Sequence, residues 1–363
     1  NKMEAKGLFN VARKEFIGHL TSKRFIVILG LFLIISALAM HQGINNYNER
    51  LDAYKEQISQ IKEGPEGPVG WMPEKPSIML VFMFMSSYIM MLGAILAIAM
   101  GFDLLSKEKE TKSLKSLLSC PVFRDEIING KALGGTLALV FAMGTALLIS
   151  LAILLIFSIV PSMNELAAIL VFGIVSIVFL LAYFSIALMM STVSRDSGSA
   201  LIYTLVIFFI LGSLLPIVGS TVADMVSGEP PEPPAFDIPY RTNESEGHIY
   251  NWEGSNEEMQ QYQEEVKAWS EKRKPITETF NIISPNMNYQ KISFLISNPQ
   301  IYSAVYEKST PTSGSMTIAF GGEAAPGLQE VLGKVWKNIL ALISFSVVFF
   351  AIAYIRFMRM DIR

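Results

Sequence analysis

The chain has 363 residues, of which 51% are hydrophobic and only 17% are charged, and its formal net charge is −3. Soluble domains usually carry about 25% charged residues, so this composition argues against a water-soluble globular protein. The small net charge argues against a nucleic-acid partner, because such partners demand clustered basic charge. The single cysteine, Cys120, excludes an intrachain disulfide and a cysteine-based metal cage.

Residues 1–24 are predicted to form an interfacial helix that leads into the membrane. Phe9, Phe16 and Leu20 fall on one helical stripe, and Arg13 lies mostly off that stripe. An apolar stripe flanked by basic residues is typical of a helix lying in the membrane interface. A plain solvated helix is the alternative.

Long runs without Asp, Glu, Lys or Arg predict six membrane-spanning helices. A span needs about 20 apolar residues, and a charge at its centre costs about 2.5–3.5 kcal/mol, so such runs are not expected in soluble folds. We therefore predict an all-α membrane protein. The spans are placed at residues 25–41, 77–102, 132–160, 166–194, 197–223 and 338–356.

The orientation follows from the distribution of Lys and Arg among the short loops. Basic residues are dense in residues 1–24 and 103–131 and recur in the tail 357–363, whereas the turn 161–165 has none. We therefore expect a multi-pass protein of the cell membrane with both termini in the cytoplasm. Segments 42–76 and 224–337 are then extracytoplasmic.

The outer segments are predicted to form a mainly helical extracytoplasmic domain. Apolar residues spaced by three and four from Ile44 to Ile61, and again from Met259 to Trp269, predict two helices with one apolar stripe each. We expect these stripes to pack together, although each could pack elsewhere. Ser284 followed by Pro285 predicts a helix start, and an extracytoplasmic protein partner is possible for this domain.

The loop 103–131 between the second and third spans is the most informative segment. It is densely charged up to Lys115, becomes apolar at its leucines, and then meets Pro121, which ends a helix. Asp125 and Glu126 open a second helix. The pattern predicts a short helix–turn–helix on which a soluble protein could dock.

The string from Glu108 to Lys131 resembles the coupling segment of type-two ABC export permeases, whose pattern is roughly Glu-x-Glu-x-Gly-Thr-Leu, Leu-Leu-Ser-x-Pro-Val-x-Arg, Glu-Ile and Gly-Lys. Lys112 departs from this pattern, because the family often has Gly or a small residue there. The resemblance extends to the stretch from Ile283 to Ser293 and to the closing residues from Phe357 to Arg363, and it is greatest to permeases grouped with multicopper-enzyme maturation systems. The candidate coupling residues are Glu108, Glu110, Leu114, Leu117, Leu118, Pro121, Arg124 and Glu126.

The resemblance implies a mechanism and a set of partners. A separate cytosolic ABC ATPase would hold the coupling helix in a cleft, and closure of two ATPases on ATP and Mg would rock two permease copies, or one copy and a homologue, within the lipid membrane. The chain itself contains no Gly-x-x-x-x-Gly-Lys-Ser/Thr loop, so it is expected to bind no cofactor and to be no enzyme.

Few features of the spans bear on a substrate. Met79, Met83 and Met90 could present soft sulfur ligands to Cu(I), but flexible apolar packing is the usual role of methionine, so no metal site is assigned. The leading hypothesis is an exporter permease. The alternatives are a mechanotransmission subunit that moves its outer domain without transporting a solute, and a membrane scaffold without an ATPase.

Overall fold

The computed structural model describes residues 2–63, 75–113, 123–232, 256–298 and 327–360. Every regular element within these ranges is helical, and six helices are long and apolar enough to cross a membrane. The prediction of an all-α membrane protein with six spans is therefore confirmed.

Four of the six spans are single long helices, and the other two each contain a π-helical turn. Spans one, three, four and six are single helices, namely α2 (Lys23–Glu63), α7 (Arg124–Ile156), α8 (Met163–Val193) and α14 (Leu328–Met358). Span two consists of α3 (Leu80–Tyr88), the π-turn η1 (Ile89–Gly93) and α4 (Ala94–Gly101). Span five consists of α9 (Ser197–Phe209), the π-turn η2 (Ile210–Leu214) and α10 (Leu215–Ser227).

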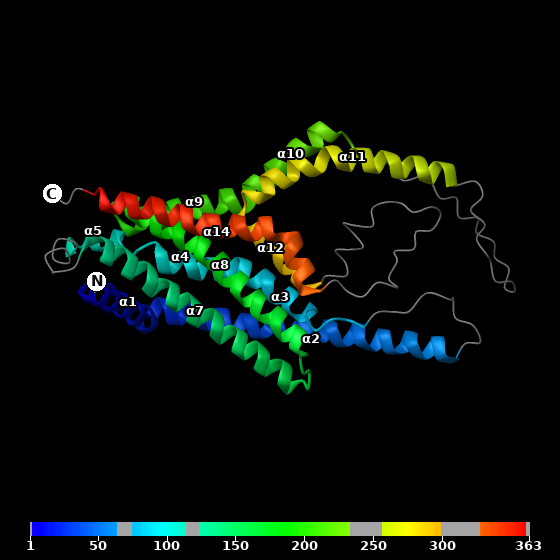
Figure 1. The fold of residues 1–363 in the computed structure, drawn as a ribbon, viewed down its shortest axis with the longest axis horizontal. Helices are drawn as coiled ribbons and strands as arrows, with labels where there is room; N and C mark the ends of the chain where they lie inside the picture. The colour runs from blue at the N-terminus through cyan, green and yellow to red at the C-terminus, as the bar shows by residue number, and fades with distance from the viewer. Residues whose placement is uncertain (1, 64–74, 114–122, 233–255, 299–326, 361–363) are drawn as a thin grey trace.

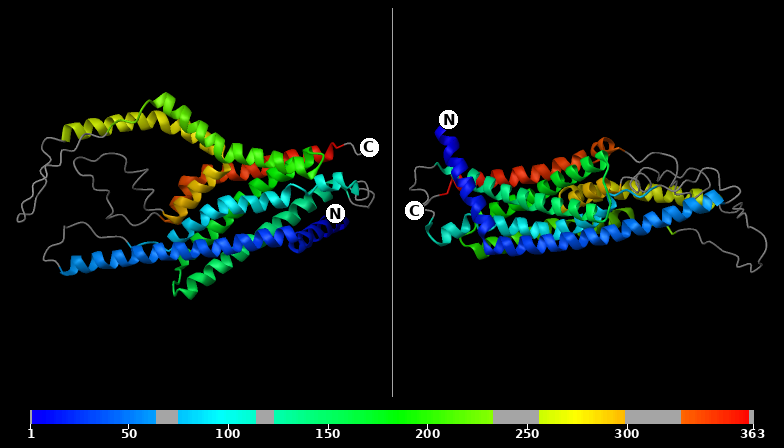
Figure 2. Two further views of the ribbon diagram at one scale, coloured as in Figure 1. Left: turned by 180° about the vertical axis from the view of Figure 1, so that it is seen from behind. Right: turned by 90° about the horizontal axis from the view of Figure 1, so that it is seen from below.

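Four shorter or polar helices complete the described fold. They are α1 (Lys2–Thr21), α5 (Ser106–Glu110), α11 (Asn256–Ile282) and α12 (Pro285–Ser297). Both chain ends lie at one end of the elongated bundle, called the termini end below, while α11 and the second half of α2 project from the opposite, far end (Figures 1 and 2).

Span one extends well beyond its charge-free run. The helix α2 has 41 residues and is therefore roughly 60 Å long, about twice the thickness of a hydrocarbon core. The span predicted at 25–41 and the outer helix predicted in 42–76 thus form one uninterrupted helix.

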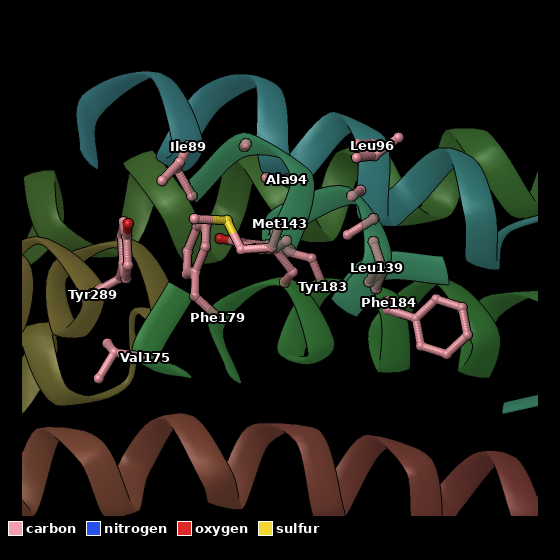
Figure 3. Packing of buried hydrophobic residues seen from close by; sticks show 14 of the residues in the cluster. Ile89, Ala94, Leu96, Leu139, Met143, Val175, Phe179, Tyr183, Phe184 and Tyr289 are labelled. Atoms are coloured by element: carbon pink, nitrogen blue, oxygen red, sulfur yellow. The ribbon is translucent and has the colours of Figure 1, made fainter. Parts of the chain in front are cut away.

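The core lies around α8, which packs against α4, α7, α9, α12 and α14. Figure 3 shows the aromatic centre of this core, where the Phe179 ring stacks on Tyr289 of α12 with centroids 4.4 Å apart and meets Tyr183 edge-on at 5.3 Å. The Ser284 hydroxyl accepts a hydrogen bond from the Met287 amide at the start of α12, which confirms the predicted helix start.

The helix α11 packs along α10 and not along α2, so the predicted pairing of the two outer stripes is wrong. The Trp269 indole donates a hydrogen bond to the Gly228 carbonyl at 3.0 Å, and Arg273 forms an ion pair with Asp224. Trp269 is the last residue of the predicted stripe, so only this end of the stripe lies at the end of span five, and α10 contacts the later part of α11.

Candidate functional site

The short helix α5 lies at the termini end, directly after span two, and its start is held by α8. The backbone amides of Leu105 and Ser106 both donate to the Ser191 hydroxyl at 2.9 Å. The first amides of a helix lack partners within the helix, so Ser191 supplies an acceptor for two of them. The position of α5 is therefore tied to the end of span four.

Glu108 links α5 to two further helices through a buried ion triad. The Lys131 ammonium of α7 lies 2.7 Å from a Glu108 carboxylate oxygen and 2.7 Å from a Glu15 carboxylate oxygen of α1. The side chain of Lys131 is 3% exposed, and those of Glu15 and Glu108 are 18% and 20% exposed. Two carboxylates surround one cation, which satisfies a buried charge that would otherwise be strongly destabilising.

The side chain of Lys109 caps the C-terminal end of span four. Its ammonium donates to the carbonyls of Ser191, Thr192 and Ser194 at 3.0, 2.6 and 2.9 Å, where α8 ends. The last carbonyls of a helix have no intrahelical donors and carry partial negative charge, so a cation there is favourable in both respects.

Glu110 and Asp196 hold the start of span five. A Glu110 carboxylate oxygen accepts a hydrogen bond from the Ser197 amide at 3.3 Å. Asp196 accepts from the Ser199 amide and hydroxyl, both at 2.8 Å, and these bonds lower the pKa of Asp196. Successive residues of α5 therefore contact the end of one span and the beginning of the next.

Arg124 and Glu126 act at the other end of the loop. The Arg124 guanidinium donates to the Met360 carbonyl at 3.0 Å, beside the end of α14. A Glu126 carboxylate oxygen accepts from the Phe123 amide at 3.0 Å and so caps its own helix, α7.

Four of the eight predicted coupling residues fall within the described structure, and all four are used inside the chain. Glu108 binds α7, and Glu110 binds the start of α9. Arg124 binds the segment after α14, and Glu126 caps the start of α7. The remaining four lie outside the described residues: Leu114, Leu117, Leu118 and Pro121. The role of all eight in ATPase coupling stays a prediction.

Sequence reasoning missed the partners of these residues. The contacts of Glu15, Lys109, Lys131 and Ser191 were not predicted, because each joins positions that are remote in the sequence, although Lys131 stands in the family pattern. One signal was present for Lys131, since a lysine directly before a charge-free run is placed where the chain enters an apolar environment.

The predicted interfacial helix is α1, and it packs along α7. Phe16 meets Phe141 of α7 edge-on at 6.5 Å, and Leu20 packs on the core, whereas Phe9 is 64% exposed and Arg13 is exposed. The predicted stripe is therefore divided, because its second half covers a neighbouring helix and its first half does not.

The methionines named as weak copper candidates lie in span two. Met79 is buried, and Met83 and Met90 are half-buried. Within the described part of the chain, no group of three or more His, Cys, Asp or Glu side chains could hold a metal ion. No metal site is assigned here.

Six apolar spans with a polar segment between spans two and three define a multi-pass integral membrane protein. The sequence profile of the ABC-2 family transporter protein matches residues 9–362, and the chain belongs to this family. It is thus a transmembrane subunit of an ABC transporter. No curated protein sequence matches the chain. The narrower likeness to multicopper-enzyme maturation permeases stays a prediction.

Proposed function

We propose that this chain is the permease subunit of an ATP-driven exporter and that a separate cytosolic ATPase moves it through the loop 103–131. Both termini then lie in the cytoplasm, and ATP and Mg are bound and used by the ATPase. Proteins of this family are normally non-catalytic membrane subunits, which agrees with the missing phosphate-binding loop.

One observation carries the proposal. Three consecutive side chains of α5, those of Glu108, Lys109 and Glu110, bind α7, the end of α8 and the start of α9. A force applied to α5 would act on three spans together, because charge-assisted hydrogen bonds join them. A segment with these bonds is suited to pass the motion of a docked motor into the bundle.

The burial of the spans supports a second permease copy or a homologue. In the most apolar stretches of spans five and six only 11% of the residues are buried, against 56% in spans two and four. A surface of this kind is left for lipid and for a neighbouring permease, and a bundle rocked by two ATPases requires such a neighbour.

The test separates docking of the ATPase from transmission of its motion. Lys109→Met removes the cation from the end of α8 and leaves the length of the side chain nearly unchanged. We expect this variant to retain the ATPase during co-purification but to lose the change in ATPase rate that the wild-type permease causes. Lys14→Met, which removes an exposed lysine outside the loop 103–131, serves as the matched control.

Two results would overturn the proposal. One is a correctly folded Lys109→Met permease that stimulates its ATPase as the wild type does. The other is the absence of any ATPase that binds the wild-type chain, tested against the candidate nucleotide-binding subunits of the same cell.

A mechanotransmission subunit is the second candidate, and one feature favours it. The helix α2 runs unbroken for roughly 60 Å from the termini end to the far end, so displacement of its base reaches the outer domain. In sealed vesicles, ATP-dependent motion of spin labels on the second half of α2 without flux of any solute would favour this candidate over transport. A scaffold without an ATPase is set aside, because the family implies an ABC transporter.

A further inference from the structure

A cavity of about 520 Å³ lies between the interfacial helix and the bundle at the termini end. One part of its wall is apolar, and the other part is polar and charged. This volume falls within the range of about 300–1,000 Å³ found for small-molecule sites. The apolar wall consists of Phe25, Ile28, Leu96, Ala99, Met100 and Leu104.

The charged part of the wall carries one net positive charge, because its four Lys and Arg side chains outnumber its three carboxylates by one. Arg24 is paired with Asp103 at 3.2 Å, and Glu15 and Glu108 both bind Lys131. Lys23 and Lys107 also line the cavity, are exposed, and form no ion pair within the described part of the chain.

Two buried atoms of the same wall lack a hydrogen-bond partner among the described residues. They are Nε2 of His19 and the second carboxylate oxygen of Glu108. Buried polar groups are normally hydrogen-bonded, so this wall is incomplete as it stands. A ligand that brings its own hydroxyl groups would offer donors at this side of the cavity.

We propose that the cavity binds the head group of an anionic phospholipid from the leaflet at the termini end. The phosphate faces Lys23, Lys107 and Arg24, and the first carbons of an acyl chain lie on the apolar wall. Basic pockets beside transmembrane helices at the membrane surface recognise anionic head groups through this combination of charge and depth. Inorganic phosphate would make no contact with the apolar wall, whereas the acyl chain of a lipid would. We therefore propose a lipid and not free phosphate as the ligand.

The location gives binding a consequence. Helices α1, α2, α4, α5 and α7 all contribute to the wall, and the three members of the ion triad are among the lining residues. A bound lipid therefore strengthens the contact between the interfacial helix and α5. The inference concerns a ligand of the permease itself, and it stands whether or not the ATPase acts through α5.

The experiment measures lipid binding to the full-length, purified chain in detergent. Phosphatidylglycerol, phosphatidylcholine of the same acyl chains and inorganic phosphate are titrated separately, and native mass spectrometry counts the bound molecules. One variant, Lys23→Gln with Lys107→Gln, removes the two unpaired cations. A second, Ala99→Phe, fills the apolar wall without changing the charge. The matched control, Lys14→Gln with Lys112→Gln, removes two exposed lysines that do not line the cavity.

We expect one phosphatidylglycerol to bind in preference to phosphatidylcholine. Each lysine near an anionic surface contributes a factor of about 5 in affinity, so Lys23→Gln with Lys107→Gln should weaken binding by about 25-fold. Ala99→Phe should weaken it at unchanged charge, and the control variant should bind as the wild type does.

Three outcomes overturn the proposal. Equal losses in both lysine double variants would show diffuse surface attraction. Binding of inorganic phosphate at the concentrations at which the lipid binds would show a site for the free anion. Equal affinity for phosphatidylcholine would show that the cavity does not recognise the net negative charge of the lipid. If thermal unfolding shows that Ala99→Phe is misfolded, the comparison of the two lysine variants decides.

Discussion

Lys131→Met is the substitution with the most direct expected effect, because it removes the only cation of the buried triad. Glu15 and Glu108 would then face each other without compensation. Breaking a buried ion pair usually costs about 3–5 kcal/mol. Both glutamate side chains are about one fifth exposed, so the site is not fully enclosed and we expect about 3 kcal/mol, the lower end of that range.

The loss should appear first where α1 docks on the bundle. A change of about 3 kcal/mol corresponds to a shift of roughly 150-fold in the docking equilibrium. Hydrogen exchange of the α1 amides in detergent should therefore become faster by a similar factor. Lys14→Met, which removes an exposed lysine of the same helix, should leave the exchange unchanged.

A compensating variant keeps this prediction open to refutation. Lys131→Met combined with Glu15→Gln and Glu108→Gln removes all three charges and should restore most of the protection, because neutral amides tolerate the loss of the cation. If the triple variant exchanges as fast as Lys131→Met alone, or if Lys131→Met behaves like the wild type, the triad does not hold α1.

The remaining predictions concern backbone fit and pH. Gly134→Ala should destabilise the fold by about 1–3 kcal/mol in denaturant titrations, because the added Cβ atom would lie 2.7 Å from the Ala12 carbonyl oxygen. The control, Gly144→Ala, should not destabilise the fold, because no atom lies within 4 Å of its added Cβ. Lys112→Gly should raise the free energy of unfolding by up to about 1 kcal/mol, because Lys112 has a φ of 57°, a left-handed backbone that glycine adopts at lower cost. A lower denaturation midpoint for this variant would contradict the prediction. Burial lowers the pKa of His19, and Lys131 adds to that effect, while Glu15 and Asp103 oppose it. The unfolded state therefore takes up a proton first as the pH falls through about 6.5, so stability should decrease below that pH, and His19→Gln should lose this part of the pH dependence of the melting temperature.

The spans were predictable because insertion of a segment into the hydrocarbon core depends mainly on the composition of that segment itself. Charge-free runs found all six spans, and a serine followed by proline found the start of α12. Extensions past the membrane were not predictable in the same way. The helix α2 continues to Glu63 because nothing in its polar second half breaks it, although no hydrocarbon requires it there.

The connections of α5 could not be derived from the sequence, because they join positions far apart along the chain. The pattern included Glu108, Glu110 and Lys131, but it did not indicate that Glu108 binds the Lys131 ammonium or that Glu110 binds the Ser197 amide. Lys112 is instructive, since the family pattern has a small residue where this chain adopts a left-handed backbone. The pattern therefore records a turn of the chain at that position as well as any contact with a partner.

Both π-helical turns, η1 and η2, contact α12. Such a turn accommodates one residue more than α-helical winding would, and each residue of an α-helix turns the chain by about 100°. Spans two and five thus each carry a spare residue near α12. If the π-helical turn becomes α-helical, one half of the span rotates relative to the other half. Both halves keep their own backbone hydrogen bonds, so these spans can rotate without unfolding.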